Sequence, residues 1–234
     1  GTIDESIRHA TTKFSHLHFV TNNEAARRVI RMGENPKFVY EVGNPSLDSI
    51  KKHKKISKVL LKKKFGINFS KPYVIILQHT VTSEIETVDK NMKITIDAIK
   101  EIGIQSILIY GNADAGSKKI TKINKNSKIK QFSALSFDEY INLLKNSSAL
   151  VGNSSSGIME APYLKIPSIN IGSRQNGRLR SKSVIDVKYD KNEIKKAVIK
   201  AVNDKNFHKQ ISKSKNLYGN GNASKKIVKK LEHL

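Results

Sequence analysis

The amino-acid sequence predicts an α/β fold built around a doubly wound parallel sheet. Short apolar runs of strand length alternate with amphipathic segments of helical length, which is the pattern of parallel βαβ units. One of these runs, Tyr73–Leu77, is continuously apolar, as expected of a strand buried on both faces. Polar loops at 78–83, 111–117 and 152–157 follow three of the expected strands, and ligands of such sheets bind beyond the carboxyl ends of the strands.

The first part of the chain is expected to end at a hinge at 43–45, where Gly, Asn and Pro follow one another. Ile3, Ile7, Ala10 and Phe14 recur at helical spacing and predict the first helix. The elements expected in this part are helices over 3–15 and 24–32 and strands over 17–20 and 38–42.

Beyond the hinge, a lysine-rich helical stretch is expected to run to about Phe65, and a regular alternation of strands and helices follows it. The expected strands cover 73–77, 106–110, 128–132, 149–151, 168–171 and 184–187. The expected helices cover 85–102, 117–124, 136–146, 155–163, 192–202 and about 223–231.

The formal net charge of +23 is the most pronounced feature of the composition. Such a charge can indicate a nucleic-acid-binding protein. However, the lysines are spread over several helical stretches, and the 6% of aromatic residues provide no stacking platform between them. We therefore expect the lysines to lie on solvated helix faces, with no nucleic-acid partner.

The sequence also restricts the compartment and the chemistry. It contains no cysteine, which excludes disulfides and thiolate chemistry and suits a reducing cytoplasm. No signal peptide or apolar run of membrane-spanning length is present, so we expect no membrane partner. No His, Asp or Glu spacing indicates a metal site, and no cofactor is expected. The chain starts at Gly1 without a methionine, and we expect it to be part of a longer protein.

The most distinctive motif follows the expected strand at 149–151 and opens the next expected helix. Small residues allow a phosphate to approach the backbone, while serine hydroxyls and the N–H groups of a helix N-terminus supply donors. Glu160, about one turn later, is positioned to accept hydrogen bonds from ribose hydroxyls. The alternative is a capped helix start in a serine-rich loop. The candidate diphosphate ligands are Ser154, Ser155, Ser156 and Gly157.

Four further residues are weaker candidates. His79 directly follows a buried strand and suits a group that protonates or stabilises a departing phosphate, or it is a loop histidine without a role. Arg174 offers a forked guanidinium for an anion, or it is surface charge. Asn112 follows the strand at 106–110 and could reach a nucleoside. Asp4 is either an acid or base, or a carboxylate that favours a helix N-terminus.

Seven segments follow one another in an order that one known family shares. They are GTIDESIRH at 1–9, HLHF at 16–19, VGNPSLD at 42–48, HTVT at 79–82, NADAGS at 112–117, GNSSSG at 152–157 and GSRQNGR at 172–178. Taken together, these segments resemble the hydrolysing UDP-N-acetylglucosamine 2-epimerases, over a match from residue 1 to about residue 188. The Asn-Ser-Ser-Ser-Gly run distinguishes them from the non-hydrolysing epimerases, whereas Thr80 departs from the proline that relatives often carry.

The resemblance implies a GT-B-like fold of two Rossmann-like domains with the substrate between them. Residues 1–45 would then be the C-terminal part of the first domain, and 46–234 the second, nucleotide-binding domain with terminal helices. The implied roles are UDP binding for Ser154, Ser155, Ser156, Gly157, Glu160, Arg174 and Asn112, and catalysis for His79 and Asp4.

The implied reaction converts UDP-N-acetylglucosamine and water to N-acetylmannosamine and UDP, by elimination of UDP and addition of water. UDP-linked 2,4-diacetamido sugars are an alternative substrate, and a GT-B glycosyltransferase half is an alternative protein class. The family carries further catalytic carboxylates and an arginine before the position of Asp4, so we expect these 234 residues to turn over little substrate. A UDP-sugar is the expected partner, and a homo-oligomer is compatible with the sequence.

Overall fold

The computed structural model describes residues 3–110, 127–133 and 135–233. The chain divides into two compact units: unit 1 comprises Gly1–Lys52 and Asn216–Leu234, and unit 2 comprises His53–Lys215. The boundary predicted after residue 45 therefore lies within unit 1, and the assignment of 1–45 and 46–234 to two domains of the family stays a prediction.

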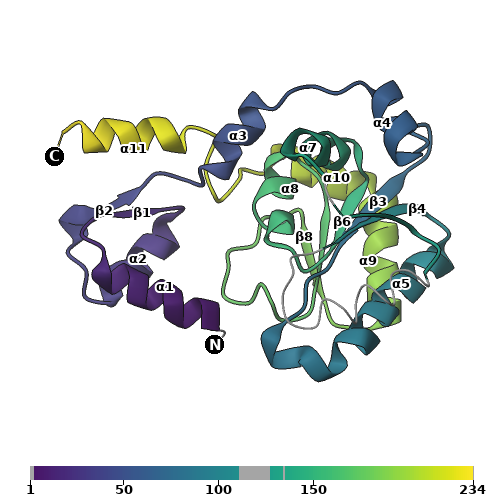
Figure 1. The fold of residues 1–234 in the computed structure, drawn as a ribbon, viewed down its shortest axis with the longest axis horizontal. Coiled ribbons are helices and arrows are strands. Elements are labelled where there is room, and N and C mark those ends of the chain that lie inside the picture. The colour runs from purple at the N-terminus through teal and green to yellow at the C-terminus, as the bar shows by residue number, and fades with distance from the viewer. Residues whose placement is uncertain (1–2, 111–126, 134, 234) are drawn as a thin grey trace. The chain divides into compact units, whose positions relative to one another are not determined.

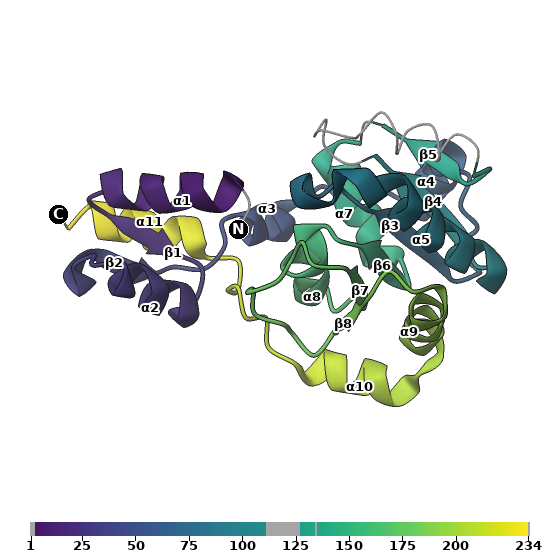
Figure 2. The same ribbon diagram turned by 90° about the horizontal axis from the view of Figure 1, so that it is seen from below.

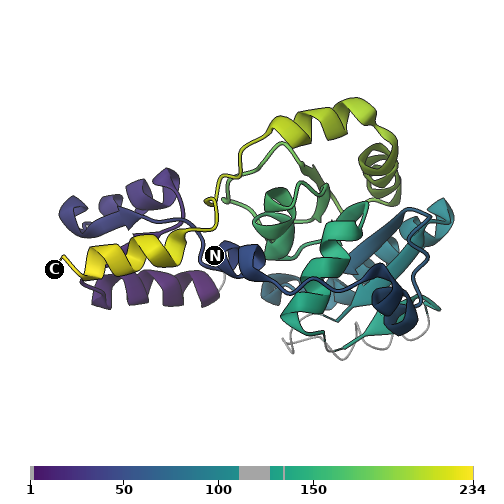
Figure 3. The same cartoon turned by 90° about the horizontal axis from the view of Figure 1, so that it is seen from above.

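Unit 1 is built on a two-stranded parallel sheet, in which His18 of β1 pairs with Val39 of β2. In Figure 1 the strands lie between α11 on one side and α1 and α2 on the other, and in the view of Figure 3 α11 runs between α1 and α2. The elements of unit 1 are α1 (Ile3–Phe14), β1 (His18–Val20), α2 (Asn23–Arg31), η1 (Pro36–Phe38), β2 (Val39–Glu41), α3 (Ser46–Lys52) and α11 (Ala223–Leu231).

The end of the chain is attached to unit 1 by hydrogen bonds near α3. The Asn44 N–H donates to Tyr218 O at 2.7 Å. The buried Asp48 carboxylate accepts from the N–H groups of Ala223 (2.9 Å) and Ser224 (2.7 Å) at the start of α11. Burial opposes ionisation of Asp48, but these hydrogen bonds outweigh it and hold the pKa of the carboxyl below its ordinary value. Asp48 therefore caps α11 as an anion.

Unit 2 contains a six-stranded, fully parallel sheet with the spatial order β5-β4-β3-β6-β7-β8 (Figure 2). Numbered along the chain, the six strands follow the order 3-2-1-4-5-6, which is that of Rossmann-type folds, with the topological switch point between β3 and β6. The predicted α/β fold class is thus confirmed. The strands are β3 (Tyr73–Leu77), β4 (Gln105–Ile109), β5 (Lys130–Phe132), β6 (Ala149–Gly152), β7 (Ser168–Ile171) and β8 (Val184–Val187).

Helices cover both faces of this sheet, as the continuous apolar strands require. Val74 and Ile76 of β3 pack into one hydrophobic cluster with α5, α9 and α10. Tyr73, Ile75 and Leu77 pack on the opposite face with α4, α7 and α8. The helices of unit 2 are α4 (Lys58–Phe65), η2 (Thr82–Thr87), α5 (Val88–Ile102), α7 (Phe137–Asn146), η3 (Ser155–Gly157), α8 (Glu160–Tyr163), α9 (Lys191–Asn203) and α10 (Lys205–Lys213).

The helix expected over 155–163 is replaced by the 3₁₀ turn η3 and the four-residue helix α8. Pro162 provides the physical reason, because it has no N–H to donate to Ile158 O in a continuous helix. The serine motif is therefore a tight turn, and its available N–H groups differ from those of the regular helix N-terminus that was expected.

Two other expectations were wrong in detail. The lysine-rich helix is divided into α3 and α4, because Asn142 of α7 binds the intervening backbone and Ser57 caps α4 through Leu60 N. Helix α10 was missed, although Asp204 caps it and its apolar residues Phe207 and Ile211 are four positions apart. The helix expected over 117–124 lies outside the described residues.

Candidate functional site

Two predicted loops meet at the switch point of the unit 2 sheet. β3 and β6 are hydrogen-bonded neighbours, and Leu77 pairs with Gly152 at their carboxyl ends. His79 follows β3, and the serine turn follows β6. Gly152 has a φ of +137°, and a Cβ there would lie 2.2 Å from Leu77 O, so only glycine permits this close approach. The fold thus brings His79 and the serine turn to one edge of the sheet.

The serine turn uses some of its N–H groups and leaves others available. The Ser156 N–H donates to Ser154 Oγ at 3.3 Å, and the Gly157 N–H donates to Ser154 O at 3.0 Å. The next two N–H groups, of Ile158 and Met159, both donate to Ser155 O. The hydrogen bonds found among the described residues leave the N–H groups of Ser154 and Ser155 unused. The available donors therefore lie at the start of the turn.

The second half of the turn is held by packing beneath it. The Ser156 hydroxyl lies 2.5 Å from the Tyr140 hydroxyl of α7. Burial and the nearby Glu160 carboxylate raise the pKa of Tyr140, although the hydrogen bond to Ser156 opposes the rise, so the phenol stays protonated. A Cβ at Gly157 would lie 2.3 Å from Ser168 Oγ, so a side chain there would force the buried Ser168 hydroxyl to move. Tyr140 and the Ser168 contact thus fix the shape of the turn.

Asn153 connects the turn to the loops on either side of it. Its side-chain Oδ1 accepts from the His79 N–H at 2.7 Å, and its Nδ2 donates to His79 O at 2.9 Å. Its main-chain carbonyl accepts from Arg174 Nη1 at 3.2 Å and from Gln175 Nε2 at 2.7 Å. These bonds bring the predicted residues His79 and Arg174 to the same turn.

Tyr189, which follows β8, completes this set of contacts. Burial and the Glu84 carboxylate raise its pKa to about 12, while a hydrogen bond with the Asn153 side chain and the Arg174 charge oppose the rise. Its ring packs so closely against Gly172 that a Cβ there would lie 2.5 Å from the ring. Tyr189 therefore lies between the switch point and a neighbouring pocket.

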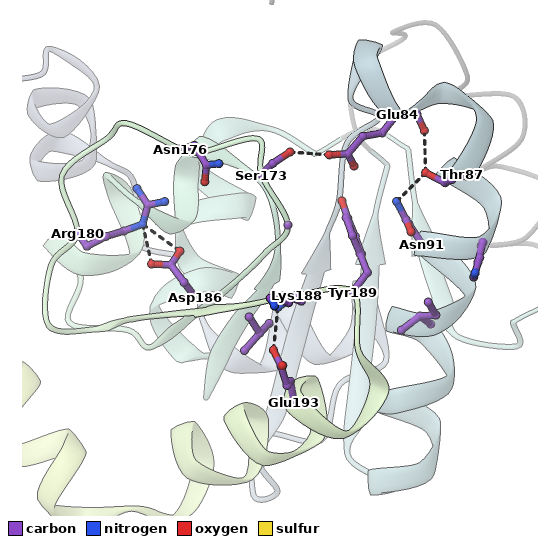
Figure 4. Close-up of a pocket in the computed structure, with 14 residues that line it drawn as sticks. Glu84, Thr87, Asn91, Ser173, Asn176, Arg180, Asp186, Lys188, Tyr189 and Glu193 are labelled. Carbon is purple, nitrogen blue, oxygen red and sulfur yellow. Dashed lines mark hydrogen bonds and ion pairs between the residues drawn. The ribbon is translucent and has the colours of Figure 1, made fainter. Parts of the chain in front are cut away.

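That pocket, of about 890 Å³, lies beside the ends of β7 and β8, between α5 and α9 (Figure 4). Figure 4 shows Arg180 paired with Asp186, Ser173 bonded to Glu84, and Tyr189 pointing toward Glu84. None of the predicted site residues that the structure describes lines it.

The electrostatics favour the switch point over this pocket as an anion site. The guanidinium of Arg180 is already committed to Asp186, at 3.0 Å to each carboxylate oxygen. Glu84 and Glu193 add two further carboxylates to a wall that also carries Lys90 and Lys188, so its formal charges balance and offer a diphosphate no net attraction. The start of the serine turn instead offers unused N–H groups next to Arg174.

The hydrogen bonds given above do not involve three of the predicted residues. Glu160 begins α8, directly beyond the turn. Asp4 lies in α1 of unit 1, and Asn112 lies outside the described residues.

Sequence reasoning assigned no role to Asn153, Tyr140 or Tyr189. The position of Asn153 and Tyr189 just after a strand is a signal, but their partners become visible only once the strand order is known.

Two features are absent from the described part of the chain. No group of three or more His, Asp or Glu side chains there is arranged to hold a metal ion. Among the same residues, no helix combines the length and the apolar character needed to cross a membrane.

Comparison with known proteins identifies the family. The family model described as UDP-N-acetylglucosamine 2-epimerase matches residues 1–232. The UDP-N,N'-diacetylbacillosamine 2-epimerase (hydrolyzing) of Legionella pneumophila is 33% identical over 99% of this chain and 61% of its own length. The GDP/UDP-N,N'-diacetylbacillosamine 2-epimerase (hydrolyzing) of Campylobacter jejuni is 37% identical over 80% of this chain and 50% of its own length. The chain thus spans about half to three fifths of these relatives.

Solved structures agree on the fold. The UDP-GlcNAc 2-epimerase from Neisseria meningitidis, bound to UDP-GlcNAc, superposes with a TM-score of 0.84 at 18% identity, over 99% of this chain and 65% of that one. This likeness confirms the GT-B-like fold class. The unused donors at a Rossmann-type switch point, the family match and the relatives all agree with the resemblance seen in the sequence, and the chain belongs to the UDP-N-acetylglucosamine 2-epimerase family.

Proposed function

We propose that the switch-point edge of unit 2 binds the diphosphate of a UDP-sugar. One observation carries the proposal: the unused N–H groups of Ser154 and Ser155 lie at the carboxyl end of β6, where the neighbouring loop presents His79. Hydroxyls of the same two serines add donors. Arg174, whose guanidinium reaches the adjacent carbonyl of Asn153, supplies positive charge.

The other predicted UDP ligands have places in this proposal. Ser156 and Gly157 complete the diphosphate-binding turn, with their bonds to Tyr140 and Ser154 setting its shape. Glu160, directly beyond the turn, accepts from the ribose, and Asn112 serves the nucleoside. Unit 2 is then the nucleotide-binding part of a GT-B-like protein, and residues 1–45 belong to its other domain.

For the whole protein we propose hydrolysing 2-epimerisation of a UDP-linked 2-acetamido sugar. A base removes the C2 proton while the C1–O bond breaks, so that UDP departs and a glycal forms. Water then returns a hydroxyl to C1 and a proton to C2 with inversion, which releases the free epimerised sugar. His79 stabilises the departing diphosphate, and Asp4 acts as an acid or base.

The names of the relatives support this substrate class. They include UDP-N,N'-diacetylbacillosamine and UDP-N-acetylglucosamine 2-epimerases, whose sugars share the 2-acetamido group. The further carboxylates and the arginine that the resemblance implies before Asp4 are not among these 234 residues. We therefore propose that this chain binds UDP but turns over little UDP-sugar.

Calorimetric titration of the chain with UDP tests the proposal. We expect the double variant Ser154→Ala/Ser155→Ala to weaken UDP binding about tenfold or more, equivalent to about 1.4 kcal/mol, because two donors to the diphosphate are lost. The matched control is Ser212→Ala/Ser214→Ala at the end of α10, where both hydroxyls bond only to local carbonyls.

The control should change the affinity less than about twofold, equivalent to about 0.4 kcal/mol. UMP should bind more weakly than UDP, because it lacks the phosphate that the turn would hold. The Ser154/Ser155 variant keeps both backbone N–H groups, so an affinity equal to that of the unaltered chain would remove only the two hydroxyls from the proposed site. Failure of the unaltered chain to bind UDP would contradict the proposal itself.

A further inference from the structure

The Asn153 side chain makes an unusual pair of bonds to the backbone of a single residue. Its Oδ1 accepts the His79 N–H at 2.7 Å, while its Nδ2 donates to His79 O at 2.9 Å. Asn153 is fully buried, with 0% of its surface exposed. A buried amide that satisfies both polar groups of one residue fixes that residue in position, since breaking either bond leaves an unsatisfied group away from water.

The location of this bond pair gives it a specific consequence. The β3–β6 ladder ends at the Leu77–Gly152 pair, and Gly152 then turns the chain out of the strand with a φ of +137°. The Asn153 side chain offers the donor and acceptor that the next ladder residue would have offered. The Asn153 side chain thus continues the hydrogen bonding between the two strands beyond the end of the ladder, as far as His79.

Asn153 is itself held from the other side. Its carbonyl accepts from Arg174 and Gln175. Loops that follow β3, β6 and β7 are therefore joined through this one residue. Ser154 and Ser155 come directly after it in the chain, so a ligand held by their N–H groups is coupled to the loop that carries His79.

We propose that Asn153 is a positioning residue that locks the His79 backbone to the serine turn, so that the imidazole stays beside a diphosphate bound there. This inference rests on the proposed function. In the unaltered chain, UDP binding at the turn should also change the surroundings of the His79 imidazole. Without the two hydrogen bonds from the Asn153 side chain, UDP should still bind at the turn, but the change at His79 should be reduced.

The chain offers a closely matched control in Asn142 of α7. Asn142 is 5% exposed, its Oδ1 accepts the Ile56 N–H at 3.1 Å, and its Nδ2 donates to Lys54 O at 2.8 Å. It thus binds another backbone segment in the same two-point manner, on the approach to α4. Asn142→Ala removes the same chemistry from unit 2 without touching the switch point.

The test is nuclear magnetic resonance of the full chain during titration with UDP. In the unaltered chain and in Asn142→Ala, saturation with UDP should shift both the Ser154 and Ser155 amide signals and the imidazole signals of His79. In Asn153→Ala, UDP should still shift the serine amides, but the His79 imidazole shift should fall by at least half. If Asn153→Ala does not fold, Asn153→Ser carries the same expectation, because its shorter side chain cannot reach both groups.

The outcomes separate this inference from the proposed function. If UDP does not perturb the serine amides of the unaltered chain, the proposed function fails, and this inference fails with it. If UDP moves the serine amides and His79 equally in the unaltered chain and in the Asn153 variants, the proposed function stands and the positioning role is overturned. An equal loss of the His79 response in Asn142→Ala would also overturn it, since the effect would then reflect destabilisation of unit 2.

Discussion

Units 1 and 2 differ in how their strands are supported. All five residues of β3 in unit 2 are buried, and helices pack on both faces of its sheet. In unit 1, β1 and β2 have three residues each, and α2 contributes no buried residue. Phe14 of α1 is 86% exposed. A two-stranded sheet is marginal without further packing, so unit 1 depends on specific polar contacts such as those of Asp48.

This difference separates the proposed activities. The Rossmann-type strand order, the switch point and the serine turn all lie in unit 2, which has two hydrophobic clusters. The residues that we propose as diphosphate ligands therefore all lie within one well-packed unit. Asp4, the candidate acid or base, lies in unit 1, so the proposed chemistry needs residues from both units.

The largest expected effect comes from the same substitution made once in each unit. Ile75 of β3 is 0% exposed, whereas Ile7 of α1 is 58% exposed. Ile75→Ala should lower the free energy of unfolding of unit 2 by about 2–5 kcal/mol, through lost burial and a cavity. Ile7→Ala should change that of unit 1 by no more than about 0.5 kcal/mol. Hydrogen exchange of peptides from each unit measures both values.

If Ile75→Ala and Ile7→Ala lower the free energy of unfolding of their own units equally, the two units are packed alike. Destabilisation of unit 1 by Ile75→Ala, as large as that of unit 2, would show that they unfold together. Either result would break the comparison on which the assignment of binding to unit 2 depends.

A smaller effect is expected at the cap that holds α11 to α3. The folded-state pKa of Asp48 lies below its ordinary value, so its stabilisation is present above the unfolded pKa and is lost as the pH falls through the folded pKa. Exchange of α11 amides, corrected for intrinsic rates, should thus accelerate below about pH 4. Asp48→Asn should weaken α11 docking by about 1 kcal/mol, because it can satisfy only one of the two N–H groups.

The matched control for this cap is Asp190→Asn in unit 2, where Asp190 caps α9 through the Glu193 N–H at 2.8 Å. It should leave α11 exchange unchanged. If Asp48→Asn keeps the acid-induced acceleration of α11 in full, the Asp48 carboxylate is not what attaches the C-terminal helix.

Much of the fold could be predicted from apolar patterning. The strands Tyr73–Leu77, Ser168–Ile171 and Val184–Val187 have the bounds expected from the sequence, because each is a short run limited by polar or turn residues. The division between α3 and α4 could not be predicted in this way. It depends on Asn142, which lies far along the chain and binds the backbone of Lys54 and Ile56.

Candidate residues for the site could be named from the sequence, but the hydrogen bonds that connect them could not. A serine-rich turn after a strand indicates an anion site, but Pro162 and the 3₁₀ bonds decide which N–H groups are unused, and these are at 154 and 155. The link between His79 and Asn153 requires β3 and β6 to be neighbours, although they are separated in the chain by two other strands of the sheet. Periodicity indicates that strands exist but does not give their order.

The central claim is that UDP binds at the start of the serine turn in unit 2. Hydrogen–deuterium exchange of the chain with and without UDP tests it most directly, because the unused Ser154 and Ser155 amides should exchange rapidly until a diphosphate accepts from them. The account predicts slower exchange in peptides that cover 153–158 and 78–80, and no change in α1 or α11 of unit 1. Protection confined to the Glu84–Tyr189 pocket, with none at the serine turn, would contradict it.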